Sequence, residues 1–265
     1  GVIVHSLAEL AHDLPVQLLH PESIDIIDGG SKPRRQLVDW LLFHVEPVFY
    51  SAWLRYHRAL VQRNALLKTL RVDETEWQVW EKELAESALI LHKLRAASID
   101  GWLFFVQNAI LLLLPQLVLK VDYVAGFDVE KDFVTQLTES RLKDRERGHT
   151  QLGPHRADLR LKTDLGLVEA VLSRGQKKLL ICALKLAQVD FLKANNKNCV
   201  VLLDDVASEL DVLARLRLLT HLQQLDAQVL MTAVEADTVW PVLCELDNQA
   251  ALFHVEQGEV TPRYF

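Results

Sequence analysis

The clearest hydrophobic pattern in the chain lies between residues 173 and 193, where apolar side chains recur at steps of three and four. Leu179, Leu184 and Ala187 belong to this stripe, which predicts one buried face of a helix. Ser173 is a favourable N-cap, and Gln176 follows at the position that a reciprocal capping box requires. The pattern therefore predicts a helix that begins at Ser173.

The first turn of this helix has two interpretations. Its free backbone N–H groups, the positive end of the helix dipole and the missing side chain of Gly175 together suit an anion such as phosphate. Alternatively, the turn only caps a helix of the core. Both interpretations fit the local pattern.

The last hundred residues alternate between short apolar runs and helical patterns. Their expected order is strand 199–205, helix 209–225, strand 227–233, short helix 236–246 and a terminal hairpin over 251–260. Near the start of the chain, a strand is expected at 15–20 and a helix near 37–43. Such alternation predicts a parallel sheet covered by helices.

Two long helical patterns stand between these parts. The first begins at Pro47, and the second begins after the N-cap Asp73 and ends at Pro115, with Gly101 as a candidate break. Because only two or three residues join them, they predict an antiparallel helical arm. A strand at 117–127, a charged helix at 129–147 and two extended segments around a Gly-Pro turn follow.

These patterns predict an α/β fold whose mostly parallel sheet is interrupted by a helical arm with a small β element. The expected parts are residues 1–45, the arm 46–147, and residues 148–265.

Composition narrows the class of protein. With 265 residues, 50% hydrophobic and 25% charged residues, the chain is expected to form a globular fold. The net charge of −7 means that any contact with nucleic acid must come from local basic patches. Three cysteines without CxxC spacing point away from disulfides and zinc. The most apolar run, from Trp102 to Leu114, is shorter than the roughly 20 residues of a spanning helix, so no membrane is expected.

Candidate chemistry lies in the segment NCVVLLDDVASELD. Asp204 and Asp205 end an apolar strand, at the edge where ligands of open α/β sheets bind. One carboxylate there is suited to hold Mg²⁺, and the other to orient or deprotonate a water that attacks a γ-phosphate. The alternative is that the two residues only end the strand and cap the segment from Val206 onward.

Basic residues gather in three places, and each is a candidate DNA contact through phosphates. Charged helix faces are more often only solvated. The candidates are Lys32, Arg34 and Arg35 in KPRR, Arg141, Lys143, Arg145 and Arg147 in RLKDRER, and Arg156 with Arg160. His155 in GPHRAD is either catalytic or, as we favour, a residue that stabilises a turn.

The order LSRGQ, an apolar strand with two acids, and then SELD resembles the ATP-binding-cassette superfamily. Together with GPHRADLRL and GGSKPRRQLVDW, these motifs resemble the bacterial RecF family over most of the chain. The resemblance implies part of an ATPase head like that of SMC proteins, in residues 1–45 and 148–265, and a helical arm. It also implies signature contacts to nucleotide in a second subunit, from Ser173, Arg174, Gly175 and Gln176, and a D-loop containing Ser208 and Asp211.

For function, the resemblance implies a cytoplasmic recombination mediator in DNA repair and replication. Such a protein binds ATP with Mg²⁺ at Asp204, forms an ATP-dependent homodimer and binds single-stranded or gapped DNA. It loads RecA with RecO and RecR and belongs to the SOS response.

The chain departs from the family in one important respect, because it contains no GxxxxGK[ST] sequence. We therefore expect that the N-terminal nucleotide lobe of the family is missing and that this chain does not hydrolyse ATP unaided. Thr232 and Ala233 stand where transporter cassettes place a histidine, which disfavours a transporter. The alternative function is a non-catalytic module that binds partners or dimerises through the arm.

Overall fold

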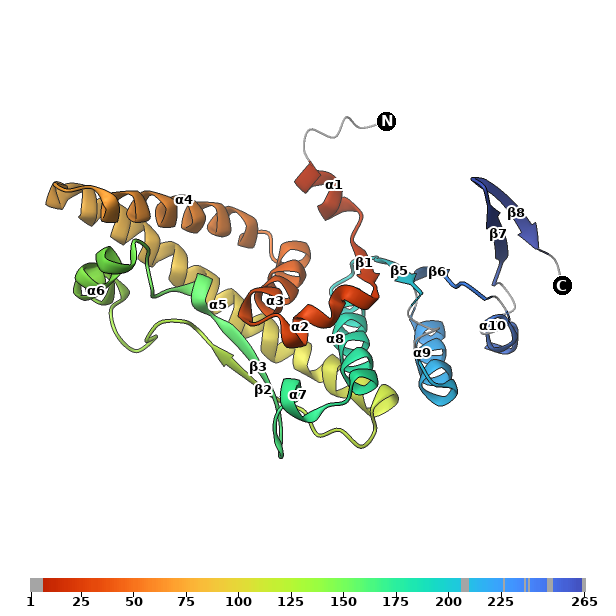
Figure 1. The fold of residues 1–265 in the computed structure, drawn as a ribbon. Helices are drawn as coiled ribbons and strands as arrows, with labels where there is room; N and C mark the ends of the chain where they lie inside the picture. The colour runs from red at the N-terminus through yellow and green to blue at the C-terminus, as the bar shows by residue number, and fades with distance from the viewer. Residues whose placement is uncertain are drawn as a thin grey trace.

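The computed structural model describes residues 7–205, 210–225, 227–235, 237, 239–246 and 250–263. Its elements are α1 (Leu7–Asp13), β1 (Val16–Leu19), η1 (Pro21–Ile24), α2 (Asp25–Asp28), α3 (Ser31–Val45), α4 (Phe49–Lys68), α5 (Glu74–Leu113), β2 (Lys120–Val124), α6 (Phe133–Arg147), η2 (Pro154–Arg156), β3 (Asp158–Thr163), β4 (Gly166–Leu167), α7 (Val168–Val171), α8 (Arg174–Ala194), β5 (Val200–Asp204), α9 (Val212–Gln224), β6 (Gln228–Thr232), α10 (Trp240–Leu246), β7 (Leu252–Glu256) and β8 (Glu259–Arg263). Figure 1 shows α4, α5 and α6 as an arm at one end, and α9, α10 and the terminal hairpin at the other.

The predicted parallel sheet is confirmed, with strand order β1-β5-β6. Leu18 pairs with Leu202, which in turn pairs with Leu230. These residues point to the outer face, where Leu18 is 43% and Leu230 is 54% exposed. Side chains alternate along a strand, so Val201 and Leu203 point to the opposite, buried face.

Helix α8 covers the buried face of this sheet and runs antiparallel to β1. Lys185 donates a hydrogen bond to the carbonyl of Leu18, and the Gln17 amide donates to Gln188, further along α8. The N-terminus of α8 therefore points past the carboxyl ends of the strands. Lys185 is half-buried by this packing, and its burial lowers its pKa to about 8.

Helix α5 is continuous over 40 residues, so the break considered at Gly101 does not occur. A Cβ atom at Gly101 would lie 3.0 Å from Cε2 of Phe191 on α8. Glycine thus allows α5 and α8 to approach closely here. Through this contact and its packing on α4, α5 joins the arm and the α8 layer in one hydrophobic core that includes Trp102 and Val106.

Part of α5 is long and apolar enough to cross a membrane by length and composition, although 39% of that window is buried inside the protein. A core helix passes the same test, and α5 packs on both α4 and α8. This feature is therefore weak support for a membrane segment.

Helix α6 and the segments around the Gly-Pro turn differ from the predictions. Helix α6 begins at Phe133 because Asp132 accepts a hydrogen bond from the Thr135 N–H and acts as its N-cap. Of the two extended segments expected around the Gly-Pro turn, only the second forms a strand, β3, which pairs with β2 and β4 in a small antiparallel sheet.

Candidate functional site

Asp204 and Asp205 lie at the carboxyl end of β5, as predicted. Thr232 pairs with Asp204 across the sheet, and its Oγ1 donates a 2.8 Å hydrogen bond to Asp204 Oδ1. The same hydroxyl accepts a 3.1 Å hydrogen bond from the backbone N–H of Asp205. Asp205 has a φ of +50°, a left-handed conformation that is unfavourable for a residue with a side chain. Thr232 therefore stabilises both acids in their observed conformation.

The Asp204 side chain fits one ligand of a magnesium ion. It is exposed, and its Oδ2 makes no hydrogen bond to the residues that the structure describes. Mg²⁺ is commonly held by one or two carboxylates together with phosphate oxygens and water. The described residues contain no group of three or more His, Cys, Asp or Glu that could hold a metal, so most ligands of such an ion would be water molecules or the phosphates of a bound nucleotide.

The capping box at the start of α8 is confirmed. The Gln176 N–H donates to Ser173 Oγ at 3.3 Å, and the Ser173 N–H donates to Gln176 Oε1 at 2.9 Å. Ser173, Arg174 and Gly175 are exposed, and a Cβ atom at Gly175 would meet no other atom within 4 Å. The first turn of α8 is therefore open to a ligand.

The α8 turn and the two acids lie toward the same end of the sheet but on different faces. From Lys185, which contacts β1, α8 extends roughly 16 Å back to Arg174. Asp204 lies only roughly 7 Å beyond Leu202, on the outer face, whereas α8 packs on the inner face. A single chain thus does not bring Arg174 and Asp204 into one pocket, and nucleotide contact by the α8 turn in a second subunit stays a prediction.

The structure describes only one of the two predicted D-loop residues. Ser208 lies outside the residues that the structure describes. Asp211 is the N-cap of α9, because its side chain accepts a 2.9 Å hydrogen bond from the Ala214 N–H. Contact of Asp211 with a second subunit stays a prediction.

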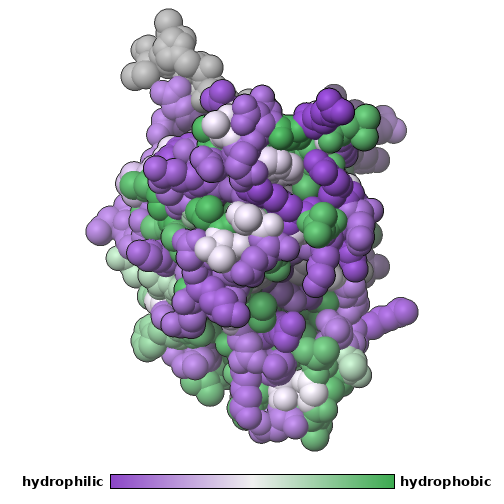
Figure 2. Space-filling view, turned by 90° about the vertical axis from the view of Figure 1, so that its left-hand side faces the viewer, coloured by the Kyte–Doolittle hydropathy of each residue, from purple (hydrophilic) through white to green (hydrophobic). Residues whose placement is uncertain are grey.

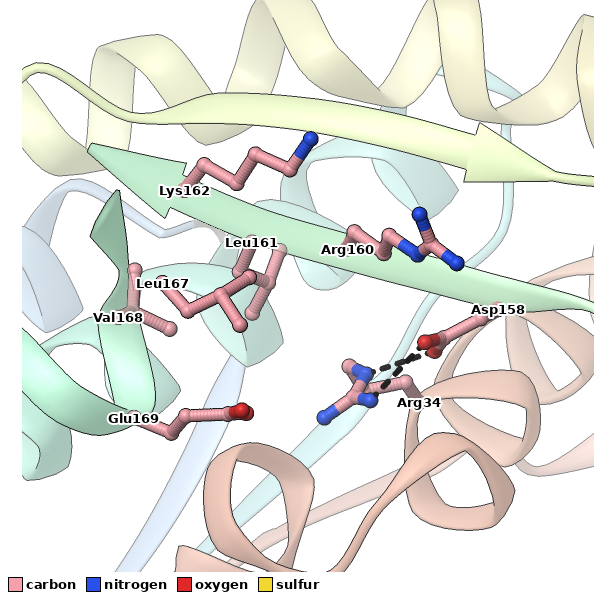
Figure 3. A pocket seen from close by; sticks show the side chains of 8 residues that line it. All are labelled: Arg34, Asp158, Arg160, Leu161, Lys162, Leu167, Val168 and Glu169. Carbon is pink, nitrogen blue, oxygen red and sulfur yellow. Dashed lines mark hydrogen bonds and ion pairs between the residues drawn. The ribbon is translucent and has the colours of Figure 1, made fainter. Parts of the chain in front are cut away.

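Arg34 and Arg35 both make contacts within the fold, and their role as DNA contacts stays a prediction. Arg34 is 8% exposed and forms two hydrogen bonds with the Asp158 carboxylate, at 2.9 and 3.1 Å (Figure 3). Arg35 donates to Ser31 and to the carbonyl of Ala157. Burial and the neighbouring Arg95 lower the pKa of Arg35.

Arg34 and Asp158 line a cavity of about 410 Å³ between α3, β3 and α7 (Figure 3). Its walls combine the apolar Leu161 and Val168 with charged groups of both signs, including Arg160 and Glu169. Since this lining does not favour one charge, the cavity does not define a phosphate site.

The basic residues of α6 divide into one structural and three exposed side chains. Arg141 binds the carboxylates of Glu81 and Glu74, and its role as a DNA contact stays a prediction. Lys143, Arg145 and Arg147 are exposed, as is Lys32 on α3. The face at the free end of the arm is mostly hydrophilic (Figure 2), which suits solvated or phosphate-binding charges.

His155 stabilises a turn, as we favoured from the sequence. Its Nε2 lies 3.0 Å from the carbonyl of Thr150, and its Nδ1 lies 2.5 Å from the Tyr56 hydroxyl. The Tyr56 hydroxyl donates to Nδ1 when Nε2 carries the proton. Burial lowers the pKa of His155 to about 4, which keeps the ring neutral.

Sequence reasoning missed the role of Thr232, which we had noted only as a residue in place of a histidine. The signal that was available is its position: Thr232 ends an apolar strand, as Asp204 ends the preceding one. In a parallel sheet the ends of such strands meet at one edge.

Comparison with known proteins agrees with this architecture. The family model for the RecF/RecN/SMC N terminal domain matches residues 4–261. Two solved structures share the fold at 22% sequence identity: RecF-ATPrS in the RecFOR pathway, with a TM-score of 0.81 over 98% of this chain and 70% of that one, and RecF-ATP, with 0.79 over 95% and 68%.

Among proteins of known family, the DNA replication and repair protein RecF of Acinetobacter baumannii strain ATCC 17978 is 49% identical over 98% of this chain and 73% of its own length. The RecF protein of Acinetobacter baylyi is 49% identical over 98% of this chain and 73% of its own length. The RecF protein of Vibrio vulnificus strain CMCP6 is 41% identical over 96% of this chain and 70% of its own length. The chain therefore belongs to the RecF family of DNA replication and repair proteins.

Proposed function

We propose that this chain acts in a recombination mediator whose two copies close on ATP. The observation that carries the proposal is the pair of acids at the carboxyl end of β5, held by Thr232, at the sheet edge where α/β proteins bind ligands. Related solved structures of RecF are those of its ATP and ATPrS forms. ATP with Mg²⁺ is accordingly the proposed ligand.

In this proposal each residue has a defined task. Asp204 provides a carboxylate oxygen to Mg²⁺, which neutralises phosphate charge when bound. Asp205 accepts a hydrogen bond from the water that attacks the γ-phosphate. In a second copy, the Ser173 hydroxyl, the Gly175 N–H and the side-chain amide of Gln176 donate hydrogen bonds to phosphate oxygens, and Arg174 stabilises their negative charge.

The same proposal includes the other partners of such a mediator. Asp211 and Ser208 lie between the two copies of an ATP-dependent homodimer. The exposed cations of α6 contact the phosphates of single-stranded or gapped DNA. RecO and RecR are proposed partners because related structures belong to the RecFOR pathway. We further propose that the protein helps to load RecA, takes part in the SOS response and is located in the cytoplasm.

The test compares this chain with a protein in which a family-type GxxxxGK[ST] lobe precedes Gly1. We expect ATP to bind tightly and to induce dimers only in the longer protein, as measured by fluorescent nucleotide titration and sedimentation. In that protein Ser173→Arg should abolish ATP-induced dimers, whereas Ser51→Arg on exposed α4 should not. Dimers that persist in Ser173→Arg would refute the role of the α8 turn.

A second candidate function is a non-catalytic module that binds partners through the arm. Exposed apolar side chains on α4, namely Leu54 and Val61, and Val48 just before it favour this candidate. Asp204→Asn in the longer protein separates the two functions. If repair of gapped DNA is unchanged in cells that carry this variant, the arm module is the better description.

A further inference from the structure

Three polar residues stand side by side at the carboxyl edge of the parallel sheet. Leu19 pairs with Leu203, and the next residue of β5, Asp204, pairs with Thr232. His20 directly follows Leu19, so the register of β1 and β5, continued by one residue, puts it opposite Asp204. Since neighbouring strands are about 4.8 Å apart, an imidazole at His20 and the Asp204 carboxylate can reach one ligand.

His20, Asp204 and Thr232 are also in phase along their strands. Each stands two positions after an outer-face residue, which is Leu18 in β1, Leu202 in β5 and Leu230 in β6. Because side chains alternate along a strand, an extended backbone places all three on the outer face, opposite to α8. The hydrogen bond between Thr232 and Asp204 shows this arrangement for two of them.

The His20 side chain makes no other polar interaction within the described part of the chain. Its backbone carbonyl accepts a 3.0 Å hydrogen bond from the Ser23 N–H, which fixes the turn after β1. The imidazole is half-buried and forms no hydrogen bond, ion pair or ring contact with the residues that the structure describes. Asp204 Oδ2 is similarly available, because Thr232 binds only Oδ1.

We propose that His20 and Asp204 together bind a divalent cation, that Thr232 orients Asp204 for this purpose, and that the site prefers Mn²⁺ to Mg²⁺. An imidazole nitrogen is a better ligand for first-row transition metals than for Mg²⁺, which prefers an all-oxygen shell. In the context of the proposed function, which this inference deepens, the same cation would contact the phosphates of the nucleotide. Binding of the cation itself requires neither nucleotide nor a second subunit.

The test is a titration of this chain with Mn²⁺, observed through the NMR signals of its ¹³C-labelled histidine rings at pH 7.5. The paramagnetic ion should broaden the His20 signal first, and a tenfold excess of Mg²⁺ should not restore it. Isothermal titration calorimetry should show that His20→Ala weakens Mn²⁺ binding about tenfold, a change of about 1.4 kcal/mol. Asp204→Asn should abolish the broadening of His20, whereas Asp100→Asn, at an exposed position of α5, should leave it unchanged.

Thr232 provides a test of orientation. Thr232→Ser keeps the hydroxyl and should preserve Mn²⁺ affinity, whereas Thr232→Val should lower it severalfold while the amide spectrum remains that of a folded protein. The proposal is overturned if Mn²⁺ at saturation does not broaden His20, if Asp204→Asn leaves that broadening intact, or if equimolar Mg²⁺ removes it. These outcomes are independent of ATP binding, so they differ from a failure of the proposed function.

Discussion

Arg63 and Asp144 form a 2.7 Å ion pair in which both side chains are completely excluded from solvent. The same guanidinium binds Glu81 at 3.1 Å and Thr150 at 2.8 Å. These contacts join α4, α5 and α6 and connect them to the segment before the His155 turn. The arm is therefore held by a buried polar network as well as by its hydrophobic core.

Replacement of Arg63 by Met should destabilise the protein by about 3 kcal/mol or more, because Asp144 would remain buried without its cation and Glu81 would keep only Arg141. Urea unfolding gives the free energy of unfolding. Arg55→Met is the control, since Arg55 pairs with Glu83 at the surface and should lose less than about 1 kcal/mol. Equal effects of the two substitutions would contradict the importance of burial.

Stability should decrease as pH falls from 6.5 toward 4. Burial lowers the pKa of both His155 and His44 to about 4, from 6.5, so between these values the unfolded chain binds more protons than the folded one. Each histidine should therefore contribute a loss of up to about 1.4 kcal/mol per pH unit within this window, with full stability above it.

Urea unfolding at pH 7.5, 6 and 5 measures this dependence. His155→Asn should be less stable at pH 7.5, because the partner of the Tyr56 hydroxyl is lost, but its stability should change less with pH. His149→Asn, at an exposed position, should retain the original dependence. An unaltered pH profile in His155→Asn would show that His155 is not responsible.

Gly101→Ala should fail to stabilise α5, although alanine in a helix interior is usually favoured by about 1 kcal/mol. The new Cβ would lie 3.0 Å from the Phe191 ring and push α8 away. In the background Phe191→Leu, the same substitution should become less unfavourable, because the ring is gone. A double-mutant cycle by thermal unfolding measures this coupling, and additive effects would show that the two residues do not conflict.

Gly126→Ala should destabilise the protein much more than Gly148→Ala. Both glycines have positive φ, of +86° and +73°, so both substitutions carry a cost of about 1 kcal/mol for the left-handed backbone. At Gly126 the Cβ would also overlap the carbonyl oxygen of Gly153, whereas at Gly148 it would meet nothing within 4 Å. Equal losses in urea unfolding would mean that only backbone conformation matters.

The double substitution Lys143→Ala and Arg147→Ala should weaken DNA binding and reduce the slope of log affinity against log salt by up to about 2, if each cation contacts one phosphate. Fluorescence anisotropy with single-stranded DNA at several salt concentrations measures this slope. Lys93→Ala, at an exposed position of α5, is the control. A slope equal to that of the original protein would remove α6 from the DNA interface.

The elements that the sequence predicted well depend on short-range physics. The helix after Ser173 was predicted from its capping box and its apolar stripe, and the strand before Asp204 from a short apolar run. Alternation of such elements was enough to predict the parallel sheet. Hydrogen bonds and periodicity within a few residues determine these features, so they can be recognised without knowledge of distant contacts.

What only the tertiary structure decided is how each polar side chain is used. Arg34 and Arg141 have the same sequence signature as solvated cations, yet they bind Asp158 and Glu81, each at least 60 residues away. Gly101 was a candidate helix break in the sequence, whereas in the structure it allows α5 to pack closely against Phe191. Sequence alone determined the helices, the strands and the acids at the edge of the sheet, whereas folding selected their partners. Burial and ion pairing depend on which distant segments come into contact, and a pattern within a few residues does not contain that information.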